Sequence, residues 1–138
     1  MILYLDASVV LRLVLGETDA LADRGRFTGA VASALTEVEC LRTLDRLARQ
    51  ARFTSDEVSE RRMAVYQLLE EVELVDISRA VLRRAAEPFS TPLGTLDAIH
   101  LATLLHWREA TESHVTLATH DKALATATRA AGVPVIGS

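Results

Sequence analysis

The chain has 138 residues, which suits a single domain, and 49% of them are apolar, enough to build a buried core. The formal net charge of −4 excludes a protein that binds nucleic acid through a generally basic surface, so any such role must belong to a local site. The single cysteine, Cys40, excludes an intrachain disulfide and a thiolate metal cluster, and its apolar helical surroundings predict a buried structural thiol.

The amino-terminal residues and the apolar runs carry no signal for membrane targeting. Residues 1–6 have no basic region ahead of the apolar stretch and end in Asp6, unlike a signal peptide. No apolar run reaches the roughly 18 residues of a membrane-spanning helix. We therefore expect a cytoplasmic protein without a membrane partner.

Strand-like and helical patterns alternate along the whole chain. Strands are expected at residues 2–5, 30–34, 73–77, 114–118 and 133–136. Helices are expected at residues 9–15, 19–26, 36–50, 55–70, 79–87, 95–109 and 121–132, with a loop of two prolines and a glycine at 88–94. The alternation predicts one α/β domain over residues 1–138, with a parallel sheet of about four or five strands.

Four acidic residues stand where the predicted strands give way to helices: Asp6, Glu39, Asp97 and Asp121. Asp6 directly follows a wholly apolar strand, the place where open α/β sheets bind their ligands. If the fold gathers all four, two carboxylates about 4 Å apart repel by roughly 4 kcal/mol at an effective dielectric near 20. Such a cluster needs a counter-cation, and oxygen-only ligands favour Mg²⁺ or Mn²⁺, which act on phosphodiesters.

Each acid also has a plain structural interpretation, because carboxylates favour the first turn of a helix. Thr36 and Glu39 have the spacing of a capping box, and Asp97 can follow a cap at Thr95. Asp121 can be a simple N-cap. The local signals leave the structural and the functional interpretations open.

The choice of the second acid is also open from periodicity alone. Glu37 lies two residues before Glu39, so on a helix the two side chains point in different directions. The apolar positions of this helix are predicted to form its buried face: Val38, Leu41, Leu44 and Leu47.

The acids sit in an ordered set of short motifs that covers nearly the whole chain. The motifs are Leu5-Asp6-Ala7-Ser8, Ser33-Ala34-Leu35-Thr36-Glu37-Val38-Glu39, Leu96-Asp97-Ala98-Ile99-His100-Leu101-Ala102 and Thr119-His120-Asp121. In this order they resemble the successive motifs of PIN domains, in particular those of VapC-type toxins of bacterial toxin–antitoxin pairs.

The resemblance implies a three-layer α/β/α domain and a Mg²⁺-dependent endoribonuclease (Mn²⁺ being an alternative ion). Matched position by position, the acidic catalytic and metal site would be Asp6, Glu39, Asp97 and Asp121. Ser8 and Thr119 match the family's hydroxyl positions and would hold carboxylates or waters. The resemblance also implies an RNA substrate, a homodimer and inhibition by a cognate antitoxin, with which the toxin can form a higher assembly.

Several cationic or ionisable residues are weaker candidates for substrate or partner contacts. Arg42 and Arg46 recur on one side of the helix that carries Glu39, although rows of charge usually form a solvated face. His100 lies three residues after Asp97 and can share its helix face. Lys122, the only lysine, adjoins the last acid.

Other functional classes compete with the nuclease hypothesis. A PIN-like module that binds RNA or protein without cutting is compatible with the sequence, although it would more often have lost one acid. A haloacid-dehalogenase-type phosphotransferase needs a second Asp two positions after the first, where this chain has Ser8. Loss of metal-dependent cutting in Asp97→Asn would separate an enzyme from a binding module.

Overall fold

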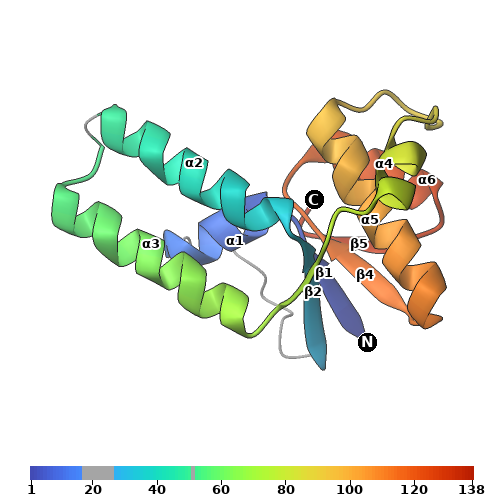
Figure 1. Ribbon diagram of the computed structural model, residues 1–138, viewed down its shortest axis with the longest axis horizontal. Coiled ribbons are helices and arrows are strands. Elements are labelled where there is room, and N and C mark those ends of the chain that lie inside the picture. Colours follow the sequence, from blue (N-terminus) through green and yellow to red (C-terminus); the bar gives the residue numbers. More distant parts are fainter. Residues whose placement is uncertain (17–26, 51) are drawn as a thin grey trace.

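The computed structural model describes residues 1–16, 27–50 and 52–138 and shows a parallel sheet between two layers of helices (Figure 1). The strands, in the spatial order β3-β2-β1-β4-β5, are β1 (Ile2–Leu5), β2 (Gly29–Ser33), β3 (Glu73–Val75), β4 (Val115–Ala118) and β5 (Val135–Ile136). The helices are α1 (Ala7–Val14), α2 (Leu35–Arg49), α3 (Ser55–Glu70), α4 (Arg79–Ala85), α5 (Thr95–Thr111) and α6 (Lys122–Ala130). The predicted α/β class and the five-stranded parallel sheet are confirmed, whereas the helix predicted at residues 19–26 lies outside the described residues.

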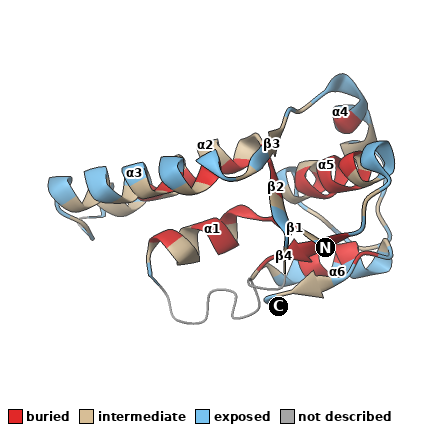
Figure 2. Ribbon diagram, turned by 90° about the horizontal axis from the view of Figure 1, so that it is seen from below, coloured by how far each residue is buried: buried red, intermediate tan, exposed pale blue. Residues whose placement is uncertain are grey.

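The alternation of side chains along each strand divides the core into two halves. Leu3 and Leu5 of β1 pack in a cluster with α1, α2 and α3. Tyr4, between them, packs in a second cluster with α5 and α6. Figure 2 shows buried residues concentrated in α1, α5 and the sheet, while the outer parts of α2 and α3 are more exposed. The sheet is therefore covered on both faces, as the three-layer prediction requires.

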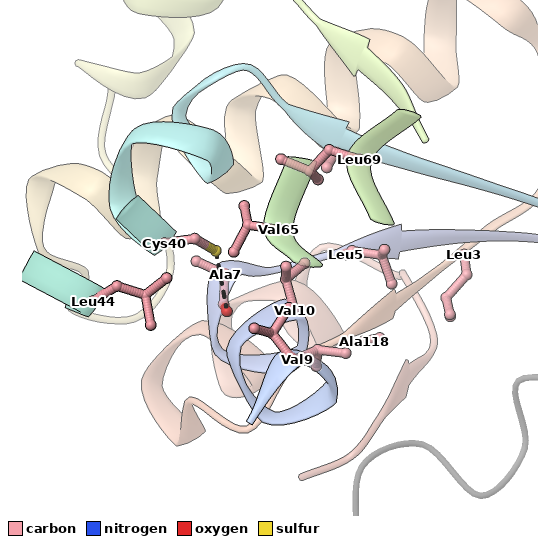
Figure 3. Close-up of a cluster of buried hydrophobic side chains, with 12 residues drawn as sticks. Leu3, Leu5, Ala7, Val9, Val10, Cys40, Leu44, Val65, Leu69 and Ala118 are labelled. Carbon is pink, nitrogen blue, oxygen red and sulfur yellow. Dashed lines mark hydrogen bonds between the residues drawn. The ribbon is translucent and has the colours of Figure 1, made fainter. Parts of the chain in front are cut away.

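The first core cluster contains the single cysteine (Figure 3). Cys40 is fully buried on α2 beside α1, and its Sγ lies 3.9 Å from the carbonyl oxygen of Ala7. Burial, followed by the charges of Glu39 and Asp6, raises the pKa of this thiol to about 12. The predicted burial of this thiol is confirmed, and its raised pKa makes the reactive thiolate scarce at neutral pH.

The predicted capping box at the start of α2 is wrong. The helix begins at Leu35 with Ala34 as its N-cap, so Thr36 is already inside it, and the Ser33 hydroxyl accepts the Leu35 N–H at 3.1 Å. A capping box forms instead at α3, where Thr54 and Glu57 satisfy each other's backbone N–H groups.

The predicted apolar face of α2 is partly wrong as well. Val38 is 55% exposed, whereas Thr36, Cys40 and Leu44 are buried at a spacing of four residues. Leu41 is only partly buried against the first cluster. The buried stripe is therefore rotated away from Val38, which leaves Glu39 free to face the edge of the sheet.

The strand order brings distant segments together at the carboxyl edge of the sheet. β1 pairs with β2 on one side and with β4 on the other, although β4 lies more than 100 residues later in the chain. The backbone N–H of Asp6 donates to the carbonyl oxygen of Ala118 at 3.0 Å, so the chain continues this pairing just past both strands. Strand order reverses direction here, which is where open α/β sheets form their ligand crevice.

Within the described part of the chain, no helix combines the length and apolar character needed to cross a membrane.

Candidate active site

Asp6 lies at the end of β1 and is held by two hydroxyl groups. It occupies the N-cap position of α1, yet its side chain makes no capping hydrogen bond. Instead, Ser8 and Thr119 both donate to its Oδ2 atom, each at 2.8 Å. The residue is 5% exposed, and its second oxygen, Oδ1, is turned toward His100. The carboxylate is thus fixed by one oxygen and leaves the other for a further partner.

Backbone N–H groups in the turn after β4 donate hydrogen bonds to those two hydroxyls. The N–H of His120 donates to the Ser8 hydroxyl and the N–H of Asp121 donates to the Thr119 hydroxyl, both at 3.0 Å. Two chains of hydrogen bonds therefore connect this turn to Asp6, one through the hydroxyl of Ser8 and the other through the hydroxyl of Thr119. This arrangement suits the predicted role of Ser8 and Thr119 in holding the first acid.

Asp121 is the N-cap of α6, as its plain interpretation predicted. Its Oδ1 accepts the N–H of Leu124 at 2.9 Å. A cap of this kind uses one oxygen of the carboxylate and restricts its rotation. Capping and participation in an acidic site are therefore compatible for this residue.

Asp97 lies in the first turn of α5, whose N-cap is Gly94 rather than the predicted Thr95. Partial burial raises the pKa of its carboxyl to about 6, with the charges of Asp121 and Asp6 adding to the effect. Three acids from three separate elements therefore influence one another at the carboxyl edge. Their mutual repulsion is the signature expected of a site that lacks its counter-charge.

Glu39 completes the group through a contact that crosses the sheet edge. It belongs to α2, and one of its carboxylate oxygens is hydrogen-bonded to Nε2 of His100 on α5. The charge of Glu39 also contributes to the raised pKa of Asp97. The structure thus turns Glu39 toward the other acids, and the ambiguity between Glu37 and Glu39 is resolved in favour of Glu39.

His100 does not lie where a contact with substrate or partner would place it. It is only 1% exposed, so it does not form an exposed surface contact, and its Nε2 atom is hydrogen-bonded to Glu39 inside the fold. Burial alone would lower its pKa, but the hydrogen bond and charge of Glu39, together with Asp6 and Asp97, outweigh burial and raise it. Its place among apolar residues of α5 was the sequence signal for burial, but the partner on another helix had no local signal.

The other predicted contacts are on the surface. Arg42 and Arg46 are exposed along α2, and Lys122 is exposed at the start of α6. Arg42 forms an ion pair with Asp45 at 3.4 Å, and Arg49 pairs with the same carboxylate at 3.1 Å. The shared Asp45 offsets part of the positive charge along this row.

The donor set of this edge fits a hard divalent cation. Its ligands would be carboxylate oxygens, and the charges of Asp121 and Asp6 add to the effect of burial in raising the pKa of Asp97. Among the described residues, no three His, Cys, Asp or Glu side chains already form a metal cage. Mg²⁺ does not need one, because it keeps several waters and is commonly held by one or two carboxylates.

A separate cavity of about 610 Å³ lies beside β1 and β2, on the face of the sheet that α1 and α3 cover. Its lining includes Leu3, Leu13, Phe27 and Leu68, and it contains none of the four acids. Its walls are mainly apolar, and Glu71 is the one carboxylate among its described lining residues, so it does not gather the acids that a metal site needs. The chemistry points to the acidic edge.

Comparison with known proteins agrees with this architecture. The sequence pattern of the PIN domain family matches residues 3–130, so the chain belongs to the PIN domain family. No curated protein sequence matches the chain.

Three solved structures illustrate the similarity of fold. The structure of FitAcB from Neisseria gonorrhoeae has a TM-score of 0.68 at 19% identity, over 98% of this chain and 96% of that one. A toxin–antitoxin complex from Klebsiella pneumoniae has a TM-score of 0.65 at 18% identity, over 88% and 89% of the two chains. VapBC2 from Rickettsia felis, bound to a DNA fragment from its promoter, has a TM-score of 0.64 at 14% identity, over 98% and 97%. At these identities the comparison establishes a shared fold.

Proposed function

We propose that the protein is a metal-dependent endoribonuclease and the toxin of a type II toxin–antitoxin pair. The observation that carries the proposal is the convergence of Asp6, Glu39, Asp97 and Asp121, from four separate elements, at the carboxyl edge beside β1 and β4. Membership of the PIN domain family and the fold shared with toxin–antitoxin proteins support it. We also propose a cytoplasmic location, where the proposed RNA substrate would be met.

The four carboxylates would hold one or two Mg²⁺ or Mn²⁺ ions, directly or through waters. Such an ion lowers the pKa of bound water and offsets charge on a phosphodiester undergoing in-line displacement. Asp6 is the most rigid member, because Ser8 and Thr119 occupy its Oδ2 atom. Asp121 is restrained by its capping bond to α6. These restraints reduce the conformational entropy lost when a cation binds.

Exposed cations beside the acids would guide RNA to the site. Lys122 adjoins Asp121 at the start of α6 and is exposed, and Arg46 is exposed on the helix that carries Glu39, whereas Arg42 is partly neutralised by Asp45. We therefore expect Arg46→Ala to weaken RNA binding more than Arg42→Ala does. Filter binding at several salt concentrations measures both effects, since phosphate contacts are salt-dependent.

The direct test is cleavage of RNA by the purified protein. Transfer, ribosomal and messenger RNA are each incubated with Mg²⁺, with Mn²⁺ and with chelator. The comparison uses the wild type, Asp97→Asn, and Glu60→Gln, which removes the same charge from the exposed surface of α3. Cleavage that disappears with chelator and in Asp97→Asn, but persists in Glu60→Gln, supports the proposal. Cleavage that survives chelation would refute the metal-dependent mechanism.

A cognate antitoxin and a second copy of the chain are the proposed protein partners. An antitoxin arginine can occupy the acidic site, because a guanidinium supplies the positive charge that a cation would supply. Inhibition should then weaken as the Mg²⁺ concentration rises. Equal inhibition at every Mg²⁺ concentration would show that the antitoxin acts elsewhere. Sedimentation of the isolated protein tests the homodimer, and sedimentation with antitoxin tests any larger assembly.

The alternative function is a PIN-like module that binds RNA or protein without cutting it. It predicts that RNA or metal binds at the acidic edge while all the RNAs remain intact under every metal condition. The two hydrogen bonds that hold Asp6 favour the enzyme hypothesis over the binding module, because precise placement of a carboxylate matters more for catalysis than for binding alone.

A further inference from the structure

The contact between Glu39 and His100 joins two helices that lie on opposite faces of the sheet. Residues of α2 pack in the first core cluster, and residues of α5 pack in the second. The hydrogen bond from His100 Nε2 to Glu39 Oε1 therefore passes over the carboxyl edge, where the acids gather. The side chain of Glu39 is 24% exposed and that of His100 only 1%. A partly exposed carboxylate is thus attached to a buried and immobile ring.

The same ring nitrogen also faces the first acid. His100 Nε2 lies 4.0 Å from Oδ1 of Asp6, the oxygen that Ser8 and Thr119 leave unoccupied. The imidazole therefore stands between one oxygen of Glu39 and one oxygen of Asp6. The single Nε2–H group is hydrogen-bonded to Glu39, and Asp6 Oδ1 lies beyond hydrogen-bond distance, so the ring orients Glu39 and acts on Asp6 only through charge.

A glutamate at the edge of a site needs such a support. Its side chain has three rotatable bonds, and ordering it costs up to about 1.5–2 kcal/mol. The bond from His100 occupies Oε1 and leaves Oε2 for a cation or its waters. Residues that hydrogen-bond to a metal ligand hold it in the orientation that binds the metal. Loss of such a residue typically weakens metal binding by about 10–100-fold.

We propose that His100 is a positioning residue that orients Glu39 for cation binding at the acidic edge. The proposal rests on the proposed function, because it assumes that the acids hold a divalent cation. This role differs from a surface contact with RNA and from simple packing in the core.

A buried histidine can also be a purely structural residue, and the two roles predict different measurements. A structural role predicts that its loss lowers the melting temperature while folded protein still binds metal normally. A positioning role predicts a loss of metal affinity that depends on Glu39. Affinity for Mn²⁺, measured on the full chain by calorimetry or electron paramagnetic resonance at one fixed pH, separates them.

The experiment compares substitutions that remove or keep the donor. His100→Leu removes it while retaining apolar volume, and His100→Gln keeps an N–H group that can reach Glu39. We expect Mn²⁺ affinity to fall by about 10–100-fold in His100→Leu and to recover to within a few-fold of the wild type in His100→Gln. If His100→Leu does not fold, His100→Asn replaces it, because its shorter amide cannot reach the glutamate.

A double-mutant cycle tests whether the effect passes through Glu39. In a Glu39→Gln background, the added His100→Leu change should alter Mn²⁺ affinity by less than about threefold. An unchanged affinity in His100→Leu, or an equally large loss in the Glu39→Gln background, overturns the proposal. Failure of the proposed function is recognised separately, as a wild type that binds no Mn²⁺ or as an Asp97→Asn variant that binds it as tightly as the wild type.

Discussion

Neutralising Asp97 should stabilise the metal-free protein while removing its proposed activity. Burial and the charges of Asp121 and Asp6 raise the pKa of this carboxyl from 3.8 to about 6. At about 1.4 kcal/mol per pH unit, that rise corresponds to about 3 kcal/mol of penalty for the charged form. Because the side chain is only partly buried, solvent screening reduces the expected gain to about 1–2 kcal/mol.

The measurement is thermal unfolding of the wild type and Asp97→Asn at pH 7.5 in chelator. For a chain of this length the gain corresponds to a melting temperature about 3–8 °C higher in Asp97→Asn. Glu60→Gln is the control, since it removes a charge from the exposed surface of α3 and should change the melting temperature much less. With saturating Mg²⁺ the wild type should gain stability by ligand binding, and Asp97→Asn should gain less.

The pH dependence of the difference gives a second check. The folded protein binds the Asp97 proton more tightly than the unfolded chain does, because its folded pKa is the higher one. The stability that this group contributes is therefore fully present below pH 3.8 and is lost as the pH rises through about 6. The advantage of Asp97→Asn should disappear near pH 4. A lower melting temperature for Asp97→Asn in chelator at pH 7.5 would refute the idea of an unbalanced acidic cluster.

Three further substitutions test the contacts that support the site and the core. Thr119→Val removes the buried hydroxyl that donates to Asp6, and should cost about 1–3 kcal/mol in urea unfolding, whereas Thr119→Ser should restore most of it. Leu44→Ala should cost about 2–5 kcal/mol because Leu44 is fully buried, and the 46% exposed Leu82 provides a control whose replacement by Ala should cost much less. Thr54→Ala should lower the free energy of unfolding by about 1 kcal/mol through loss of the capping box, and an unchanged value would show that this cap contributes nothing.

The sequence determined most of the fold because its signals are local. Apolar runs marked all five strands, and the helix predicted at residues 55–70 has the same limits as α3. The helix predicted from residue 79 begins there as α4, and the hydroxyl of Ser78 caps it by accepting the N–H of Val81. Hydrogen bonds and burial patterns of this kind depend on residues three or four apart, which a sequence displays directly.

The prediction of a capping box from Thr36 and Glu39 failed because contacts with residues distant in the sequence replaced the local hydrogen bonds. Thr36 and Glu39 have the spacing of a capping box, but strand β2 ends immediately before α2 and the helix starts earlier than the motif requires. Thr36 is consequently buried, and Glu39 reaches His100, 61 residues away, rather than back to its own helix start. The sequence has the spacing of a capping box, but tertiary packing determines which partners Thr36 and Glu39 contact.

The composition of the acidic edge could be predicted from the resemblance of its motifs, but its geometry required the fold. Pairing of β1 with β4 brings Thr119 to Asp6 across 113 positions, and packing of α5 brings His100 toward Glu39. No local signal reports such contacts, because their free energy comes from burying both faces of the sheet. The sequence by itself therefore determined which acids were available, and the tertiary structure decided which oxygens of Asp6, Glu39 and Asp121 are held by hydrogen bonds.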